Sequence, residues 1–256
     1  MTDIDLSHIL DRLDADRALS GEPSPNGDVV RWFTPDRLNC TLAYSRCTDV
    51  DIDEVIRREA ALATTGGYGL EWKTYGHDKP VDLRTRLAAA GYEAEPVEKF
   101  MVLRLTSEAV NAFDAPRQNP HPNPPLEHDV RRVETLDDFL ATCDDPERDR
   151  DWFGQELEQN PDSMSLYVAY VDGLPVAGAR LAYNGRSEFA GLYGGKTLPA
   201  FRNQGHYIAL VAARVREAYE RGIAYVFIDA LPTSEPIVAK RGFVAVTDTQ
   251  PYIWPR

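Results

Sequence analysis

The 256-residue chain has few cysteines, few histidines and no long apolar run. Its three cysteines, Cys40, Cys47 and Cys143, lack the close spacing of a metal knuckle or a redox motif, so we expect reduced structural thiols. The five histidines are scattered without metal-ligand spacing, and we expect no metal. No apolar stretch approaches membrane-spanning length, and the first ten residues are acidic where a signal peptide would be basic. These absences predict a cytoplasmic protein with no membrane partner.

Positive charge is also scarce. Lysine and arginine number 28 against 41 aspartates and glutamates, which gives a net charge of -13. A nucleic-acid-binding protein usually carries a basic face, so we expect no nucleic-acid partner. The acidic balance favours solubility and, more weakly, a cationic acceptor.

Two families of motifs are absent as well. No G-x-S-x-G elbow is present, which disfavours a Ser-His-Asp hydrolase. No Lys-Ser or Lys-Thr follows a glycine turn, which disfavours a nucleoside triphosphate site.

One stretch, Ser187 to Arg221, combines a predicted strand, a polar turn and an amphipathic helix. The amides of a first helical turn have no partner inside the helix, and with the helix dipole they can bind an anion. Gly205 would let a phosphate approach the backbone, and Arg202 could add a forked donor. The simpler alternative is that Gly205 only caps the helix and Arg202 is solvated. The predicted inward stripe is Ile208, Val211, Ala212, Val215, Ala218 and Tyr219, and the predicted outward side is Arg214, Arg216, Glu217, Glu220 and Arg221.

The second half of the chain also predicts a three-stranded meander. Asp172-Gly173 and Asn184-Gly185 are hairpin signals that separate three β-prone runs ending at Tyr193. A continuously apolar run, Ala224 to Ala230, then predicts a buried strand interrupted only by Asp229.

A proline-rich segment divides the chain. Residues 115–126 contain the run APRQNPHPNPP, from Ala115 to Pro125, which cannot pack as helix or strand and predicts an extended linker. We therefore expect one domain at 1–114 and another at 127–256. An internal loop of a single domain is the alternative, but the order of elements restarts after this segment.

These residues carry a resemblance to a known family. The order of elements, the run Thr197-Leu198-Pro199-Ala200-Phe201-Arg202-Asn203-Gln204-Gly205, and the later segment Ser234 to Phe243 resemble the GCN5-related N-acetyltransferase (GNAT) family over residues 127–256. The combination of strand, T-x-P and R-x-x-G is more specific than R-x-x-G alone. The sequence departs from the family pattern at Tyr207, where Gly or Ala is usual.

The resemblance implies an α/β (α+β) fold with a mixed, mostly antiparallel twisted sheet flanked by helices and splayed between two central strands. Acetyl-CoA would lie in the opening as the acyl donor. Pantetheine amides can extend a strand edge, and pyrophosphate suits a helix start. The cofactor-binding residues implied are Lys196, Thr197, Leu198, Arg202, Asn203, Gln204, Gly205, His206 and Tyr207. For the His206 side chain, a phosphate or solvent contact is favoured over catalysis.

The implied chemistry is transfer of an acetyl group to an amine, whose pKa of about 10 requires a base or a desolvating pocket. Glu188 is the first candidate base and Asp229 the second. Either carboxylate can instead be structural, Glu188 on a solvent-facing strand and Asp229 satisfied by turn amides. Many relatives place a tyrosine acid where this chain has Val238. Ser234 or Tyr252 could substitute, although Ser234 also suits an N-cap.

The first half of the chain repeats the order of elements found in the second, which predicts an internal duplication. Its helix after Asp51 is preceded by acidic residues without a glycine, so this copy should not bind CoA. It would instead shape an acceptor cleft. The expected wall is Glu71, Trp72, Tyr75, His77 and Asp78, which could equally pack or lie on the surface.

Two functions remain open from the sequence. The first is an acetyltransferase acting in a ternary complex on a primary amine, favouring a small molecule over a protein. The second is a CoA-binding regulatory or scaffold protein without turnover. A monomer and a homodimer are both compatible with the sequence.

Overall fold

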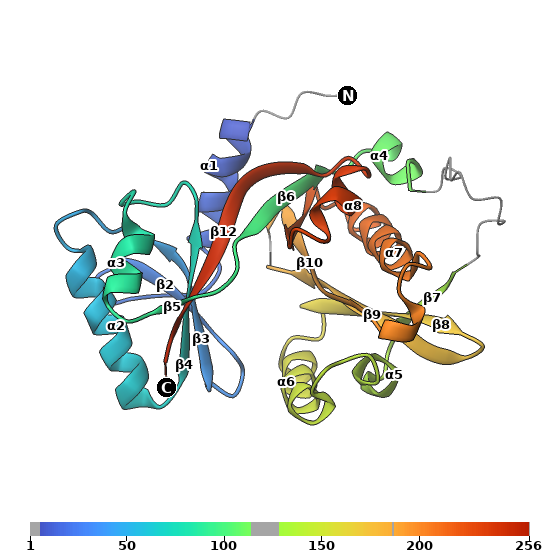
Figure 1. Ribbon diagram of the computed structural model, residues 1–256, viewed down its shortest axis with the longest axis horizontal. Helices are drawn as coiled ribbons and strands as arrows, with labels where there is room; N and C mark the ends of the chain where they lie inside the picture. Colours follow the sequence, from blue (N-terminus) through green and yellow to red (C-terminus); the bar gives the residue numbers. More distant parts are fainter. Residues whose placement is uncertain (1–5, 114–127, 186, 256) are drawn as a thin grey trace. The chain divides into compact units, whose positions relative to one another are not determined.

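The structure is a computed structural model that describes residues 6–113, 128–185 and 187–255 (Figure 1). The predicted linker at 115–126 lies outside the described residues. The chain forms two compact units, each built on a β-sheet with flanking helices, which confirms the predicted mixed α/β class. Unit 1 comprises Met1–Met101, Asp229–Glu235 and Ala245–Arg256, and unit 2 comprises Val102–Ile228 and Pro236–Val244.

Unit 1 has a mixed sheet with strand order β1-β2-β3-β4-β12, and β5 also pairs with β12. Strands β3 and β4 are parallel and are joined through α2, whose buried residues recur at helical spacing on one face. The helices are α1 (Leu6–Arg17), α2 (Ile52–Gly66) and α3 (Leu83–Ala89). The strands are β1 (Glu22–Pro23), β2 (Val29–Phe33), β3 (Asn39–Ser45), β4 (Gly69–Tyr75), β5 (Glu93–Ala94) and β12 (Val244–Trp254), with the first part of β6 (Glu98–Arg104).

The last strand of the chain belongs mostly to unit 1. Strand β12 pairs antiparallel with β4, from Thr249 opposite Tyr75 to Trp254 opposite Leu70. This pairing cannot be read from the sequence, because β4 and β12 are far apart in the chain. Unit 1 is therefore not one continuous segment of the chain, because β12 pairs with the sheet formed by the N-terminal residues.

Unit 2 has strand order β11-β10-β9-β8-β7, antiparallel except for the β10–β11 pair. At the first hairpin, Asp172 and Gly173 both have positive φ, as a tight two-residue turn requires. The strands are β7 (Asp129–Val133), β8 (Met164–Val171), β9 (Leu174–Tyr183), β10 (Phe189–Thr197) and β11 (Tyr225–Ala230). The helices are α4 (Ser107–Asn111), α5 (Leu136–Leu140), α6 (Pro146–Gln159), α7 (His206–Glu220) and α8 (Glu235–Ala239).

Helices cover both faces of the unit 2 sheet. Leu166 and Val168 of β8 pack in a core with Phe139 of α5 and Phe153 of α6. Ala169, one residue on from Val168, packs with Leu210 of α7. Because successive strand residues point to opposite faces, α5 and α6 lie on one face and α7 on the other.

Helix α7 is amphipathic, but three of its side chains differ from the sequence prediction. Tyr219 was expected inward and is 40% exposed. Arg214 and Glu217 were expected outward and are buried. Both polar groups find partners: Arg214 donates to backbone carbonyls, and Glu217 accepts hydrogen bonds from the Ser165 and Tyr167 hydroxyls. Periodicity alone predicted the wrong side because it assumes that charged residues face water.

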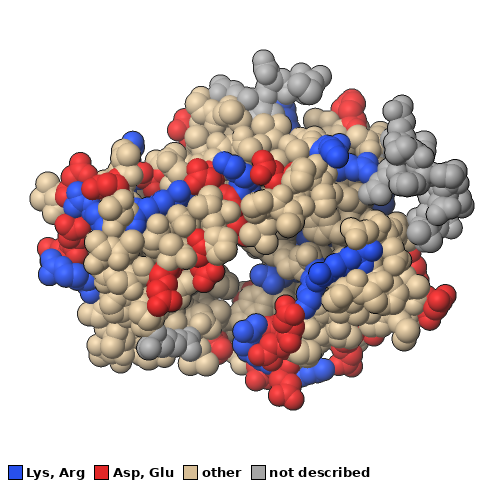
Figure 2. Space-filling view, viewed as in Figure 1, with Lys and Arg blue, Asp and Glu red and all other residues tan. Residues whose placement is uncertain are grey.

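Within the described ranges, no helix is long and apolar enough to cross a membrane. On the face shown in Figure 2, acidic and basic side chains lie near one another and do not separate into one basic surface.

Candidate functional site

The turn before α7 is shaped to present backbone amides. It follows β10 and a short 3-10 helix, Pro199–Phe201, and two of its residues have positive φ: Asn203 at 63° and Gly205 at 94°. Gly205 is the N-cap of the 15-residue helix α7, a left-handed position that strains any residue with a Cβ. Alternating left-handed residues turn successive N–H groups to one side and form a concave anion site. The helix dipole adds to this potential.

Local hydrogen bonds hold this turn against the end of β10. Arg202 Nε donates to Thr197 O at 3.2 Å, and Gln204 Nε2 donates to Ala200 O at 3.3 Å. Leu198 N donates to Val176 O of β9 at 2.9 Å. The Leu198 amide is therefore engaged by β9, whereas Thr197 O faces Arg202. Lys196, the third residue of the expected pantetheine edge, forms an ion pair with Asp144.

The sheet opens beside this turn. Parallel pairing of β10 with β11 covers Phe189, Ala190 and Gly191, opposite Tyr225, Val226 and Phe227. In the described part of the chain, β10 continues to Thr197 without further β11 pairing. Its pairing with β9 also shifts register between Tyr193 and Lys196, where Gly194 and Gly195 form an irregularity that we call the glycine bulge. The predicted splay is thus present in unit 2.

The side chain of His206 points into the protein. It is 4% exposed, and its Nδ1 lies 3.2 Å from Nδ1 of His128. Its ring also lies 6.5 Å from the ring of Phe201, centroid to centroid. Burial lowers the pKa of His206, which favours the neutral imidazole. Its backbone N–H remains in the first turn of α7, so the residue can meet an anion through its backbone but not through an exposed side chain.

The ring of Tyr207 packs against the glycine bulge. A Cβ built on Gly195 would lie 2.9 Å from Cε2 of Tyr207. The large residue that departs from the family pattern is therefore accommodated where the facing residue has no side chain.

Two of the candidate catalytic residues lie in turns. Glu188 is exposed and precedes β10 at the end where β10 and β11 are paired. At about 3.3 Å per residue, it stands roughly 30 Å along the strand from Thr197. Glu188 and the turn before α7 therefore lie at opposite ends of β10. Ser234 Oγ donates to Leu231 O at 3.1 Å, within the turn before α8.

The other two candidates belong to unit 1, where Asp229 is partly buried and Tyr252 is buried. The Asp229 carboxylate forms an ion pair with Lys73 and accepts a hydrogen bond from Thr249 Oγ1 at 3.0 Å. Tyr252 is 6% exposed and belongs to the core that includes Trp72. Its hydroxyl donates to Gln250 Oε1 at 3.4 Å.

The position at which the family resemblance implies a tyrosine acid is aliphatic and closed. Val238 lies in α8 with 0% of its surface exposed, and its carbonyl accepts from the amides of Arg241 and Phe243. No hydroxyl can be offered from this place.

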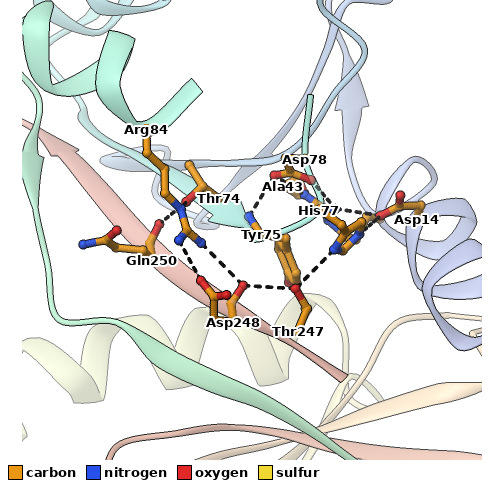
Figure 3. A network of polar contacts seen from close by, with 11 residues as sticks. Asp14, Ala43, Thr74, Tyr75, His77, Asp78, Arg84, Thr247, Asp248 and Gln250 are labelled. Atoms are coloured by element: carbon orange, nitrogen blue, oxygen red, sulfur yellow. Dashed lines mark hydrogen bonds and ion pairs between the residues drawn. The ribbon is translucent and has the colours of Figure 1, made fainter. Parts of the chain in front are cut away.

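Residues of the expected acceptor wall are largely engaged in a polar network that the sequence did not reveal (Figure 3). Arg17 donates to Asp78 at 2.9 and 3.1 Å, and its Cζ lies 3.7 Å above the ring of Tyr75. His77 Nε2 lies 3.0 Å from Asp14 Oδ1. Asp14, His77 and Asp78 have their ligand-type atoms within 4.8 Å of one another, but Arg17 already binds both carboxylates.

The remaining two wall residues are also inside unit 1. Trp72 is 1% exposed and packs in the core. Burial raises the pKa of Glu71, and the nearby charge of Lys73 opposes this shift. The start of α2, at the corresponding point of unit 1, has Asp51 in place of Gly205, and Asp51 Oδ1 accepts from Thr48 N at 2.6 Å. The Asp51 side chain makes no capping hydrogen bond, and this helix start has an acidic residue where α7 has a left-handed glycine.

Comparison with known proteins identifies the fold. No protein-family model and no curated protein matches the sequence. A functionally unknown conserved protein from Staphylococcus epidermidis is 14% identical, with 92% of this chain and 94% of that chain covered and a TM-score of 0.63. A GCN5-related N-acetyltransferase from Kribbella flavida is 15% identical, with 97% and 95% covered and a TM-score of 0.63. A tandem GNAT protein from the clavulanic acid biosynthesis pathway is 13% identical, with 84% and 74% covered and a TM-score of 0.58. The chain has the GNAT fold.

Proposed function

We propose that the protein is an acyl-CoA-dependent N-acyltransferase that transfers an acetyl group from acetyl-CoA to a primary amine of a small molecule. One observation carries the proposal: a left-handed turn with Arg202 and Gly205 joins an opened strand edge to the start of a long helix. CoA offers complementary chemistry, with a pyrophosphate for the helix start and pantetheine amides for the strand.

In this proposal, the amides from Asn203 to Tyr207 and the Arg202 guanidinium bind the pyrophosphate. The pantetheine arm follows the end of β10 along Lys196 to Leu198. Because Leu198 N already donates to β9, the pantetheine contact at this end would use the groups of Thr197 that face away from β9. His206 contributes through its amide, since its ring is buried against His128.

The reaction is a direct acyl transfer in a ternary complex. The amine nitrogen attacks the thioester carbonyl, the C–S bond breaks, the CoA thiolate leaves, and the amine loses a proton. Asp229 is the base that we retain, acting directly or through water, because it follows the paired part of β11. A thiolate has a modest conjugate-acid pKa of about 8.5 and can leave without a dedicated acid, so neither Ser234 nor Tyr252 is required.

A second candidate is a CoA-binding protein without turnover. The buried aliphatic Val238, in the place of a tyrosine acid, favours this alternative. It shares the CoA site with the first proposal and differs only in chemistry.

Two measurements test these proposals. Calorimetry with acetyl-CoA should show at least about tenfold weaker binding for Arg202→Glu, since a charge-assisted hydrogen bond contributes roughly 1.5–3 kcal/mol. Arg216→Glu, which makes the same charge change on an exposed part of α7, is the matched control. Undiminished affinity in Arg202→Glu contradicts the CoA site. Sustained thiol release with an amine panel supports acyl transfer, whereas binding without release supports the second candidate.

A further inference from the structure

Arg180 lies on β9 and projects toward the face covered by α5 and α6. Two residues earlier, on the same side of the strand, Gly178 faces Thr142: a Cβ on Gly178 would lie 2.0 Å from Thr142 Oγ1. Helix α5 therefore closes over Gly178. Arg180 lies next along this face, and it is opposite Tyr193 in the β9–β10 register.

Three aromatic rings surround the guanidinium. Its Cζ lies 5.0 Å from the ring centroid of Trp152, 5.3 Å from that of Tyr193 and 5.5 Å from that of Phe153. Such contacts stabilise the cation over the ring faces but leave its in-plane N–H groups without acceptors. The group is thus held in a fixed orientation, with its forked donors still available.

Arg180 has no anionic partner within the described ranges of the chain: its side chain forms no hydrogen bond and no ion pair there. The Asp149 carboxylate interacts electrostatically with the Arg180 guanidinium over a distance, but its Oδ1 accepts a hydrogen bond from Arg148 Nη2 at 3.0 Å. By contrast, the buried Arg17 binds Asp78 through two hydrogen bonds. An arginine that is enclosed by rings and lacks a carboxylate is suited to a carboxylate from outside the chain.

The glycine bulge lies beside the Arg180 guanidinium. A Cβ on Gly194 would lie 3.5 Å from Arg180 Nη1, and Gly194 itself is exposed. From the α7 face, Arg214 donates to Arg180 O at 3.0 Å and Tyr193 O at 3.4 Å, and it also has no carboxylate partner in the described structure. Two guanidinium groups therefore flank the bulge without a neutralising carboxylate, although the whole chain has a net charge of -13.

We infer that Arg180 binds a carboxylate of the substrate through a forked pair of hydrogen bonds at the glycine bulge. This inference rests on the proposed acyltransferase function. The carboxylate belongs either to the acceptor, as in an amino acid, or to the acyl group, as in a dicarboxylic acyl-CoA. The chemistry at Arg180 is the same in both cases.

The test compares wild type, Arg180→Met and Arg180→Lys, with Arg150→Met as the control that removes an exposed arginine from α6. In the donor arm, calorimetry compares succinyl-CoA with acetyl-CoA. In the acceptor arm, it compares β-alanine with ethylamine, and phenylalanine with phenethylamine, on the CoA-loaded protein. In one of the two arms, wild type and Arg150→Met should bind the carboxylate-bearing probe with at least about tenfold higher affinity than the probe without a carboxylate.

Arg180→Met should abolish that preference while binding acetyl-CoA as wild type does, and Arg180→Lys should retain part of it. The arm that shows the preference identifies the source of the carboxylate. Normal acetyl-CoA binding without a carboxylate preference in either arm, or a preference that survives in Arg180→Met, overturns the inference alone. If wild type does not bind acetyl-CoA, the proposed function is overturned as well.

Discussion

The ring of Tyr207 occupies the space that a side chain on Gly195 would need, with Cε2 of Tyr207 only 2.9 Å from the position of such a Cβ. The two residues come from α7 and β10, the elements on either side of the proposed pyrophosphate turn. A bulky residue in the first turn of α7 is therefore tolerated because the facing strand carries glycine.

Gly195→Ala should displace Tyr207 and disturb the start of α7. Overpacking of this kind costs about 1–3 kcal/mol, and we expect weaker acetyl-CoA binding together with a lower unfolding midpoint. Tyr207→Ala alone should change CoA affinity less, and the Gly195→Ala/Tyr207→Ala double variant should recover most of the loss. Calorimetry and thermal unfolding on the four proteins measure this coupling. Additive effects would show that the two residues do not interact as described.

Asp229→Asn tests the proposed base. The amide can still accept from Thr249 but cannot take a proton, so we expect kcat to fall by about 10²–10⁴ while the affinity for acetyl-CoA is retained. Thr249→Val is the control, since it removes the hydrogen bond and keeps the carboxylate. A steady-state assay of thiol release separates kcat from KM. An unchanged kcat in Asp229→Asn would assign this residue to the ion pair with Lys73 alone.

His206 should make the protein sensitive to mild acid. Its folded pKa lies below its ordinary value of 6.5, so below that pH the unfolded chain binds more protons than the folded one. The contribution to stability is present above about pH 6.5 and is lost as the pH falls through the folded pKa. Protonating both rings would also break the contact between His206 and His128, in which one nitrogen must accept.

The measurement is urea unfolding at a series of pH values between about 7.5 and 5. His206→Gln should show a shallower loss of stability than wild type over this range. His8→Gln, at an exposed histidine of α1, should keep the wild-type slope. Parallel curves for wild type and His206→Gln would contradict the assignment.

Arg17 and Asp78 form a buried pair whose members should depend on each other. Their side chains are 6% and 7% exposed, and Arg17→Met leaves the Asp78 carboxylate without its cation. We expect a loss of about 3–5 kcal/mol, with substantial recovery in Arg17→Met/Asp78→Asn. Arg37→Met, which breaks an exposed pair with Glu22, should cost far less, because water screens exposed charges. Chemical unfolding compares these variants, and equal costs for the two arginines would rule out the proposed dependence.

Local sequence signals predicted much of unit 2. Asp172-Gly173 specified a turn because few residues tolerate positive φ, and Gly205 marked the start of α7 for the same reason. The opened edge of β10 followed from the family resemblance and not from composition. Periodicity placed most of α7 but misplaced Arg214, because its backbone acceptors belong to a strand irregularity that the sequence does not announce.

The long-range pairings could not be read in the same way. The rings around Arg180 come from α6 and β10, and the partners of His77 and Asp78 come from α1. Neither group has a regular spacing in sequence that would bring its members together. Glu188 and the turn before α7 are at the two ends of β10, as the predicted strand between them implies, and the role of Glu188 stays a prediction.

Strand β12 constrains the order in which the protein can fold during its synthesis. A ribosome delivers β4 early, but the segment that pairs with it from Leu70 to Tyr75 emerges only after all of unit 2. During that interval the N-terminal sheet has an unfilled position at β4, open to incorrect strand partners. The sheet of unit 1 in the nascent chain is therefore completed only after β12 has been synthesised. The need for chaperones should be greatest before that point.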